Sequence, residues 1–263
     1  PYNRDTRYDW SRAPLLAITV HRLTDEEFQL TLTEPFLDGW SVTLVLSELL
    51  TLYRDGGPTQ EPIWVQPGFL AGERDALARA DSKAFWRELL TDPPVGTLPS
   101  GDPVPGYRVR EVAVTAATGS RLREVADELG GPVKWVLLAA HVQVIALLTG
   151  RTEVITGLMS HGRPESADGV RAVGMFLNAI PLRATVSGTR RALVSAVHAA
   201  EADTLPHRFY PAAQIRRESQ LDRLFETVFN FTHFRLYRDL VDDERLRLVE
   251  MRATDQTYYP LLY

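Results

Sequence analysis

Residues 31–41 read Thr-Leu-Thr-Glu-Pro-Phe-Leu-Asp-Gly-Trp-Ser, and the interpretation of the whole chain starts from this stretch. Alternating polarity over Glu27–Thr33 predicts a strand that ends as the stretch begins. Gly39–Tyr53 then places apolar side chains at helical spacing and runs into a Gly-Gly-Pro stop, so it predicts a helix. Glu34 and Asp38 therefore lie in a short loop between a strand and a helix.

Strands and helices alternate along the rest of the chain, which predicts an α/β protein. The further predicted strands are Leu15–Leu23 (antiparallel to Glu27–Thr33), Tyr107–Thr115, Val154–Met159, Val173–Val186, Glu226–Leu236 and Leu246–Met251. The further predicted helices are Glu73–Leu90, Gly119–Leu129, Pro132–Leu148, Arg190–Thr204 and Ala212–Ser219. Pro58–Gly72 is rich in proline and is predicted to be a loop. We place the boundary between two lobes in the Pro- and Gly-rich run Pro93–Gly106, with residues 1–98 before it and residues 99–263 after it.

The composition excludes several classes of function but does not identify one. With 263 residues, of which 44% are hydrophobic, the chain can bury a large core. A net charge of −5 argues against a nucleic acid or an anionic membrane as a partner. The absence of cysteine excludes a disulfide, a thiolate nucleophile and a cysteine-based metal site. Without a signal-peptide pattern or an apolar run of membrane-spanning length, the expected location is the cytoplasm.

Four other stretches carry recognisable motifs. The two stronger ones are Ser-His-Gly-Arg-Pro at residues 160–164 and Val-Gly-Met-Phe-Leu-Asn-Ala-Ile-Pro-Leu-Arg at residues 173–183. The two weaker ones are Ala71-Gly72-Glu73 followed by Phe85-Trp86, and Asp-Gln-Thr-Tyr-Tyr-Pro-Leu at residues 255–261. Together with Asp38-Gly39-Trp40-Ser41, their order and separation resemble the condensation domains of non-ribosomal peptide synthetases.

The chain departs from that family at its best-known motif, HHxxxDGWS. Thr33 and Glu34 stand in place of the two histidines, whereas the second half of the motif is intact. In addition, His161 is inserted into the SGRP turn, and Ala179 replaces the threonine of the GxFxNTxPxR segment. The resemblance covers nearly the whole chain. It implies that family segments before Pro1 and after Tyr263 are missing, so we expect a piece of a longer protein.

The resemblance implies two chloramphenicol-acetyltransferase-like lobes, each a mixed sheet with flanking helices, arranged as a V around a central tunnel. In such domains the phosphopantetheine arms of a donor and an acceptor carrier protein meet in the tunnel, and an amine attacks a thioester to form an amide. The domain itself binds no cofactor. Its implied partners are these carrier proteins and neighbouring synthetase domains, and it is expected to be a monomeric domain within a larger chain.

The second histidine of the family motif orients or deprotonates the amine, and Glu34 takes its place here. A glutamate works as a base at neutral pH only where burial raises its pKa. Pro35 biases Glu34 toward an extended backbone and removes an amide donor from the loop. A neutral amine can also react through positioning alone. Two interpretations stay open at this point: Glu34 is a working base, or the site is degenerate.

The intact half of the motif has structural as well as functional interpretations. By resemblance, Asp38 forms an ion pair with an arginine across the lobe junction, for which Arg163 is the candidate. Gly39 allows a close backbone approach, and its amide could donate to an oxyanion. The other residues expected to line the tunnel are Trp40, Ser41, Met175 and Asn178. Trp40 and Ser41 could equally be a buried ring and a hydroxyl in the first turn of a helix.

Among the six histidines, His161 is the candidate for a catalytic or substrate-contacting role, because its turn lies near the tunnel by resemblance. The alternative is an exposed turn residue. No set of His, Asp and Glu has the spacing of zinc ligands, and neither a GxSxG elbow nor a Gly-rich phosphate loop occurs. Three hypotheses remain: a condensation enzyme working through Glu34, His161 or positioning; a related acyl-transfer or thioester-modifying domain; and a non-catalytic platform that docks carrier proteins or tailoring enzymes.

Overall fold

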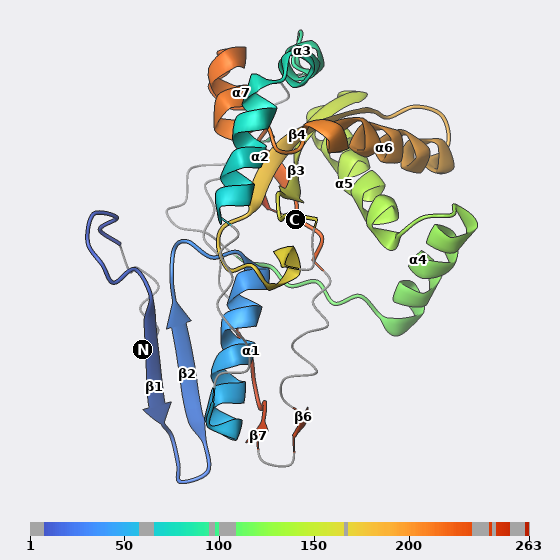
Figure 1. Cartoon of the computed structure of the whole chain (residues 1–263). Helices are drawn as coiled ribbons and strands as arrows, with labels where there is room; N and C mark the ends of the chain where they lie inside the picture. Colours follow the sequence, from blue (N-terminus) through green and yellow to red (C-terminus); the bar gives the residue numbers. More distant parts are fainter. Residues whose placement is uncertain are drawn as a thin grey trace. The chain divides into compact units, whose positions relative to one another are not determined.

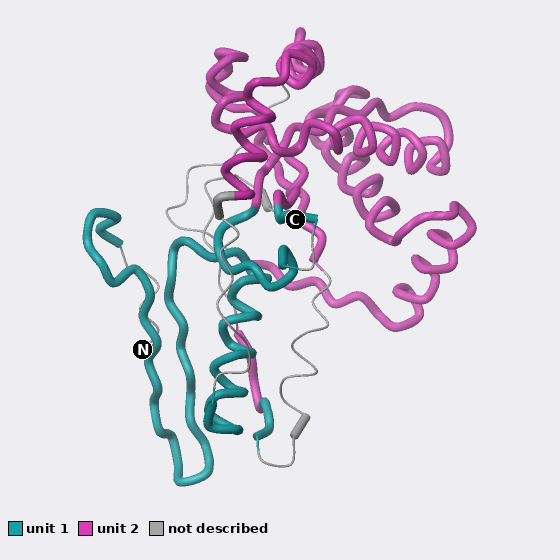
Figure 2. Tube along the Cα trace, in the orientation of Figure 1, with its two compact units in different colours: residues 1–66, 163–176, 234–248 teal, residues 67–162, 177–233, 249–263 magenta. Residues whose placement is uncertain are grey.

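The computed structural model describes residues 8–57, 66–94, 98–99, 109–165, 168–232, 242–243, 246–252 and 261–262. Figure 2 shows its two compact units. Unit 1 comprises residues 1–66, 163–176 and 234–248, and unit 2 comprises residues 67–162, 177–233 and 249–263. The two predicted lobes, residues 1–98 and 99–263, are not the same as these compact units, and the lobe boundary stays a prediction. The compact units divide the chain elsewhere, because residues 67–98 group with unit 2 and residues 163–176 with unit 1.

Unit 1 is built on a strand pair and one long helix (Figure 1). Strands β1 (Ala17–Arg22) and β2 (Phe28–Thr33) pair antiparallel, with Ala17 opposite Thr33 and Arg22 opposite Phe28. Helix α1 (Gly39–Asp55) follows, and it ends at Gly56, whose left-handed backbone lets its N–H donate to the carbonyl of Leu52. The unit also holds the short helix η1 (Gly169–Arg171) and the small antiparallel pair β6 (Asp242–Asp243) and β7 (Leu246–Arg247).

Unit 2 is a mixed sheet with helices. The strand order is β4-β3-β5-β8, in which β3 (Glu153–His161) and β4 (Leu177–Thr185) are antiparallel over their full length. Strand β5 (Thr227–Phe229) is parallel to β3 and to β8 (Leu261–Leu262). The helices of this unit are α2 (Gln66–Ala78), α3 (Ala80–Leu89), α4 (Ala116–Glu128), α5 (Val133–Thr149), α6 (Arg190–Thr204), η2 (Leu205–His207) and α7 (Ala212–Ser219).

The main hydrophobic core of the described residues lies in unit 2. It joins one face of α5 to β3, β4 and α6, with Leu138, Val142, Leu182 and Val197 fully buried. In unit 1, by contrast, only three described apolar residues are buried: Leu37, Ala172 and Phe176. Burial of apolar surface is the dominant favourable term in folding, so unit 2 contains most of what stabilises the described structure.

Most predicted elements are found within a few residues of their expected ends, and the α/β class is confirmed. The region before residue 90 differs. The Pro-rich composition predicted a loop up to Gly72, but Pro67 lies in the first turn of α2, where a proline costs no hydrogen bond. The single helix predicted over Glu73–Leu90 is divided, because Arg79 adopts an extended backbone between α2 and α3. The Nη1 of Arg79 donates to the carbonyl of Pro206 at 3.3 Å, which holds this break.

Three predicted strands also differ. Residues 109–115 of the predicted strand Tyr107–Thr115 form no strand, and residues 107–108 lie outside the described residues. Val109, Val112 and Val114 are all exposed, so this stretch has no buried apolar face. Of Leu246–Met251 only the first two residues are a strand. Of Glu226–Leu236 the structure describes a strand over 227–229, and residues 233–236 lie outside the described part.

Within the described residues, no single helix has the length and apolar character needed to cross a membrane, although the bent pair α4 and α5 passes that test when the two helices are taken together.

Candidate functional site

The loop from Glu34 to Asp38 joins β2 to α1 and ends in the N-cap of the helix. Asp38 has an extended backbone, and its Oδ1 accepts the amide N–H of Ser41 at 2.8 Å. Such a cap satisfies one of the free amides of the first helical turn. Its other oxygen accepts the amide of Phe176 at 3.3 Å, and its own amide donates to the carbonyl of Gly174 at 3.2 Å. The cap is therefore also the attachment point of the segment 163–176.

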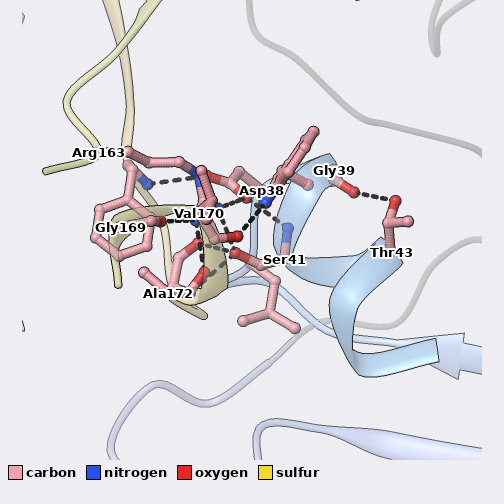
Figure 3. A network of polar contacts seen from close by, with 12 residues as sticks. Asp38, Gly39, Ser41, Thr43, Arg163, Gly169, Val170 and Ala172 are labelled. Carbon is pink, nitrogen blue, oxygen red and sulfur yellow. Dashed lines mark hydrogen bonds and ion pairs between the residues drawn. The ribbon is translucent and has the colours of Figure 1, made fainter. Parts of the chain in front are cut away.

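Ser41 makes the second connection to that segment (Figure 3). Its hydroxyl donates to the carbonyl of Gly174 at 2.8 Å and accepts the amide of the same residue at 3.0 Å. It also accepts a hydrogen bond from Arg163 at 2.7 Å. The side chain is fully buried, so these bonds replace all of its contact with water.

Arg163 is the buried cation of the site. Its Nη2 donates to Oδ1 of Asp38 at 2.6 Å and to Ser41, while Nη1 donates to the carbonyls of Gly169 and Ala172 at 3.3 and 2.5 Å. The guanidinium also lies 4.5 Å from the centre of the Phe176 ring. Burial lowers the pKa of Arg163, and the neighbouring Asp38 carboxylate opposes that shift. Arginine remains charged at any physiological pH, so the pair is ionic.

The ion pair that the family resemblance implied is thus formed. Both partners belong to unit 1, although Arg163 lies in the half of the sequence that was assigned to the second lobe. The loop that carries Arg163 has little freedom. A Cβ on Gly169 would lie 1.8 Å from the carbonyl oxygen of Pro164, and this backbone contact leaves no room for a side chain.

The neighbouring motif residues have local roles in the structure. The indole N–H of Trp40 donates to the carbonyl of Val170 at 2.8 Å, so its ring is anchored on the same segment as Arg163. The carbonyl of Gly39 accepts the hydroxyl of Thr43 at 2.8 Å (Figure 3). Gly39 itself is exposed.

Glu34 is partly buried and turned onto its own loop. Its Oε2 accepts the amides of Phe36 and Leu37 at 2.8 and 2.6 Å. Because Pro35 has no N–H, these are the first two amide donors after Glu34. Oε2 is therefore already a hydrogen-bond acceptor for the backbone, and the two bonds fix the carboxylate on its own loop.

Two further predicted site residues, Met175 and His161, are both exposed. Met175 belongs to unit 1. His161 is the last residue of β3 in unit 2 and is paired with Leu177 of β4, which agrees with a turn-side position. The network of Asp38, Ser41 and Arg163 lies in unit 1, so His161 belongs to the other unit.

Asn178 also belongs to unit 2, and its amide is fully used by the backbone. Its Nδ2 donates to the carbonyls of Arg208 and Tyr210, both at 2.9 Å, and its Oδ1 accepts the amide of Ala212 at 3.0 Å. It therefore holds the start of α7. The sequence missed this role, and it also missed the backbone groups of Gly174, which a side-chain motif does not reveal.

The part of the chain that the structure describes contains no group of three or more His, Cys, Asp and Glu side chains that could hold a metal ion. The buried His141 shares a hydrogen bond between its Nε2 and the hydroxyl of Thr156 at 2.9 Å, and burial lowers its pKa to about 4. What the network of Asp38, Ser41 and Arg163 can do is to hold a loop and a helix start in one place through a buried charge pair.

A family model described as the condensation domain matches residues 3–261. The chain belongs to the condensation domain family. This condensation domain is 37% identical over 240 residues to the AMB antimetabolite synthetase AmbE of Pseudomonas aeruginosa, which covers 87% of this chain and 11% of that protein. It is 28% identical over 273 residues to the malpibaldin synthetase of Mortierella alpina, which covers 94% of this chain and 5% of that protein.

Solved structures show the same fold for the condensation domain. The first condensation domain of the CDA synthetase superposes with a TM-score of 0.74 at 22% identity, over 88% of this chain and 55% of that one. The X-domain from teicoplanin biosynthesis superposes with a TM-score of 0.72 at 20% identity, over 86% of this chain and 56% of that one. The chain thus spans about 55% of the length of that first condensation domain and 11% or less of the two synthetases. The predicted family and its chloramphenicol-acetyltransferase-like fold class are confirmed.

Proposed function

We propose that this condensation domain acts on carrier-protein-bound thioesters in a non-ribosomal peptide or hybrid polyketide–peptide assembly line. The observation that carries the proposal is the intact network of Asp38, Ser41 and Arg163 at the start of α1. This network fixes the loop and the start of α1 in one geometry, and a fixed geometry is what catalysis by positioning requires. The phosphopantetheine arms belong to the donor and acceptor carrier proteins.

The reaction proposed is amide formation by positioning. The amine nitrogen of the acceptor attacks the carbonyl carbon of the donor thioester, the C–S bond breaks, and the thiol of the donor arm is released. The proton lost by the amine passes through solvent to the departing sulfur. Holding two reactants in a reactive geometry can supply about 7–11 kcal/mol of the barrier reduction. A missing general base costs about 10²–10⁴ in rate, so such a domain is slow but still active.

A specific observation favours a second candidate, a non-catalytic platform that docks carrier proteins or tailoring enzymes. Oε2 of Glu34 accepts two backbone amides, so the residue in the place of the family's second histidine serves the loop. The threonine hydroxyl at position 33 is not a base at neutral pH, and the two backbone hydrogen bonds fix the Glu34 carboxylate on the loop.

The two candidates are separated by amide formation with the full-length protein and its loaded carrier proteins, followed by intact-protein mass spectrometry. The natural sequence is compared with Glu34→Gln, Glu34→His and the control Glu48→Gln, which changes an exposed carboxylate of α1. Glutamine keeps an acceptor oxygen but cannot take up a proton as a carboxylate does. Catalysis by positioning predicts product with the natural sequence and a rate within about threefold of it in Glu34→Gln, because no base is lost.

Other outcomes have definite meanings. A loss of about 100-fold or more in Glu34→Gln, with Glu48→Gln unchanged, would make Glu34 a base and contradict the positioning mechanism. No product with the natural sequence, but product with Glu34→His, would establish the platform with a sound site. Absence of product in every variant would also favour the platform.

A further inference from the structure

From Pro35 to Asp38, each backbone amide donor of the loop between β2 and α1 has an acceptor. Pro35 has no N–H, the amides of Phe36 and Leu37 donate to Glu34, and the amide of Asp38 donates to the carbonyl of Gly174. Leu37 and Asp38 are both buried. Buried amides without an acceptor are rare because they lose their hydrogen bonds to water, so this loop depends on the acceptor that Glu34 provides.

We propose that Glu34 and Pro35 form a closed turn that replaces the family's histidine, and that Glu34 is a positioning residue for Asp38. The carboxylate accepts the two amides that directly precede Asp38. It thereby fixes the backbone position from which Asp38 bonds to Ser41 and Arg163. The inference rests on the proposed function only in taking this network as the working site.

The chemistry of the two side chains explains why a glutamate suits this turn and a histidine does not. A carboxylate oxygen has two lone pairs and here accepts two amides with donor–acceptor distances of 2.8 and 2.6 Å. A neutral imidazole offers one acceptor nitrogen with one lone pair. A histidine at position 34 would therefore leave at least one of the two amides without its partner.

Pro35 completes the turn. Its ring fixes its own φ near −65° and biases residue 34 toward an extended backbone. The side chain of Glu34 can then reach forward over Pro35 to the two following amides, which is the geometry observed. A residue with an N–H at position 35 would add a third backbone donor to this turn. Glu34 and Pro35 thus act as one unit.

Amide hydrogen exchange of the natural chain and its variants tests the proposal without any substrate, so its outcome is independent of whether the domain forms amides. Glu34→Gln keeps an acceptor oxygen at the same reach, whereas Glu34→Met keeps the length and removes the acceptor. Glu48→Gln and Glu48→Met are matched controls on the exposed side of α1. The amides read are those of Phe36 and Leu37, with the amides of α5 as an internal reference.

We expect amide exchange at Phe36 and Leu37 to become at least about tenfold faster in Glu34→Met. In Glu34→Gln it should stay within about threefold of the natural rate. Such a rescue would not occur if Glu34 only filled space. The Glu48 variants and the α5 amides should not change. If Glu34→Met does not fold, native-like exchange in Glu34→Gln still supports the acceptor role. Unchanged protection in Glu34→Met, or equal loss of protection in both variants, would overturn the proposal.

Discussion

At the scale of single residues, Arg163 determines whether the site keeps its shape. One guanidinium contacts Asp38, Ser41 and the carbonyls of two further residues, and it is almost fully buried. A buried ion pair adds little net stability, because both charges lose their hydration. Loss of one partner is different, since the other charge stays buried and unpaired. The pair therefore contributes more to geometry than to the free energy of folding.

A double-mutant cycle measures this difference. Arg163→Met and Asp38→Ala should each lower the free energy of unfolding by about 3–5 kcal/mol, because each leaves a buried charge without its partner. The double variant should lose much less than the sum of the two single variants. Chemical denaturation followed by fluorescence gives the four values.

The matched control for this cycle is the exposed pair Arg121 and Glu124 of α4, in which Glu124→Ala should change stability little. Strict additivity of the Asp38 and Arg163 effects would contradict the interpretation of the network as a coupled unit.

At the scale of secondary structure elements, Arg183 of the second family motif joins α3 to the sheet. Its Nη1 donates to the carbonyls of Leu89 and Thr91 at 2.9 and 2.8 Å, and its Nη2 donates to that of Asp92 at 3.2 Å. Its Nε donates to Glu153 at 2.8 Å within the β3–β4 pair. A cation at the C-terminal end of a helix satisfies free carbonyls and complements the helix dipole.

Arg183→Met should release this helix end. We expect the free energy of unfolding to fall by about 1–3 kcal/mol, because hydrogen bonds from a charged group are lost. Exchange should accelerate for the amides at the end of α3, and not for those of α5. Hydrogen exchange with mass spectrometry measures the local effect, and Arg217→Met on the exposed side of α7 is the control. A uniform change over the whole of unit 2 would contradict a local capping role.

A second inter-element contact depends on pH. His141 of α5 shares a hydrogen bond with Thr156 of β3, whose hydroxyl in turn lies 2.7 Å from that of Thr227 in β5. Burial lowers the pKa of His141 from 6.5 to about 4. Between these values the unfolded chain binds a proton that the folded chain does not bind. The histidine contribution to stability is therefore intact above about pH 6.5 and decreases as the pH falls toward 4.

The size of this contribution follows from the shift of the pKa, and it is about 3 kcal/mol at most. We expect His141→Gln, which can keep the bond to Thr156, to have a shallower fall in stability between pH 6.5 and 4 than the natural chain. Urea denaturation at several pH values measures the difference. His21→Gln, at an exposed position of β1, is the control and should follow the natural chain. Parallel curves for His141→Gln and the natural chain would contradict the interpretation.

At the scale of the whole molecule, the two units differ in how much apolar surface they bury. The main core cluster lies in unit 2, whereas in the described part of unit 1 only Leu37, Ala172 and Phe176 are buried apolar residues. In addition, every residue of β1 is exposed. A two-stranded sheet with one exposed strand is marginally stable by itself.

We therefore expect unit 1 to open before unit 2 in the 263-residue chain. Under native conditions, the amides of β1, β2 and α1 should exchange faster than those of β3, β4 and α5, because a smaller buried core gives a smaller opening free energy. Hydrogen exchange with mass spectrometry at low denaturant resolves the two groups. A single cooperative loss of protection in both units would show that they unfold together.

Elements whose sequence signals are local could be predicted from the sequence alone. Helix α6 has the predicted ends, and α1 and α5 lie within two residues of theirs. Apolar periodicity and the glycines that follow α1 and α5 are local signals. The strand predicted before α4 was wrong, since a local sequence pattern does not show whether a neighbouring strand is present. The pairing of Asp38 with Arg163 came from the family resemblance and not from any local pattern.

The sequence by itself determined the family and the order of most elements, because these depend on residue identity and short-range spacing. Only the tertiary structure decided that residues 163–176 join unit 1 and that Asn178 holds the start of α7. It also showed that Glu34 closes the loop on its own amides. Such roles depend on which backbone groups face a side chain after folding, and backbone donors and acceptors are the same at almost every position of a sequence.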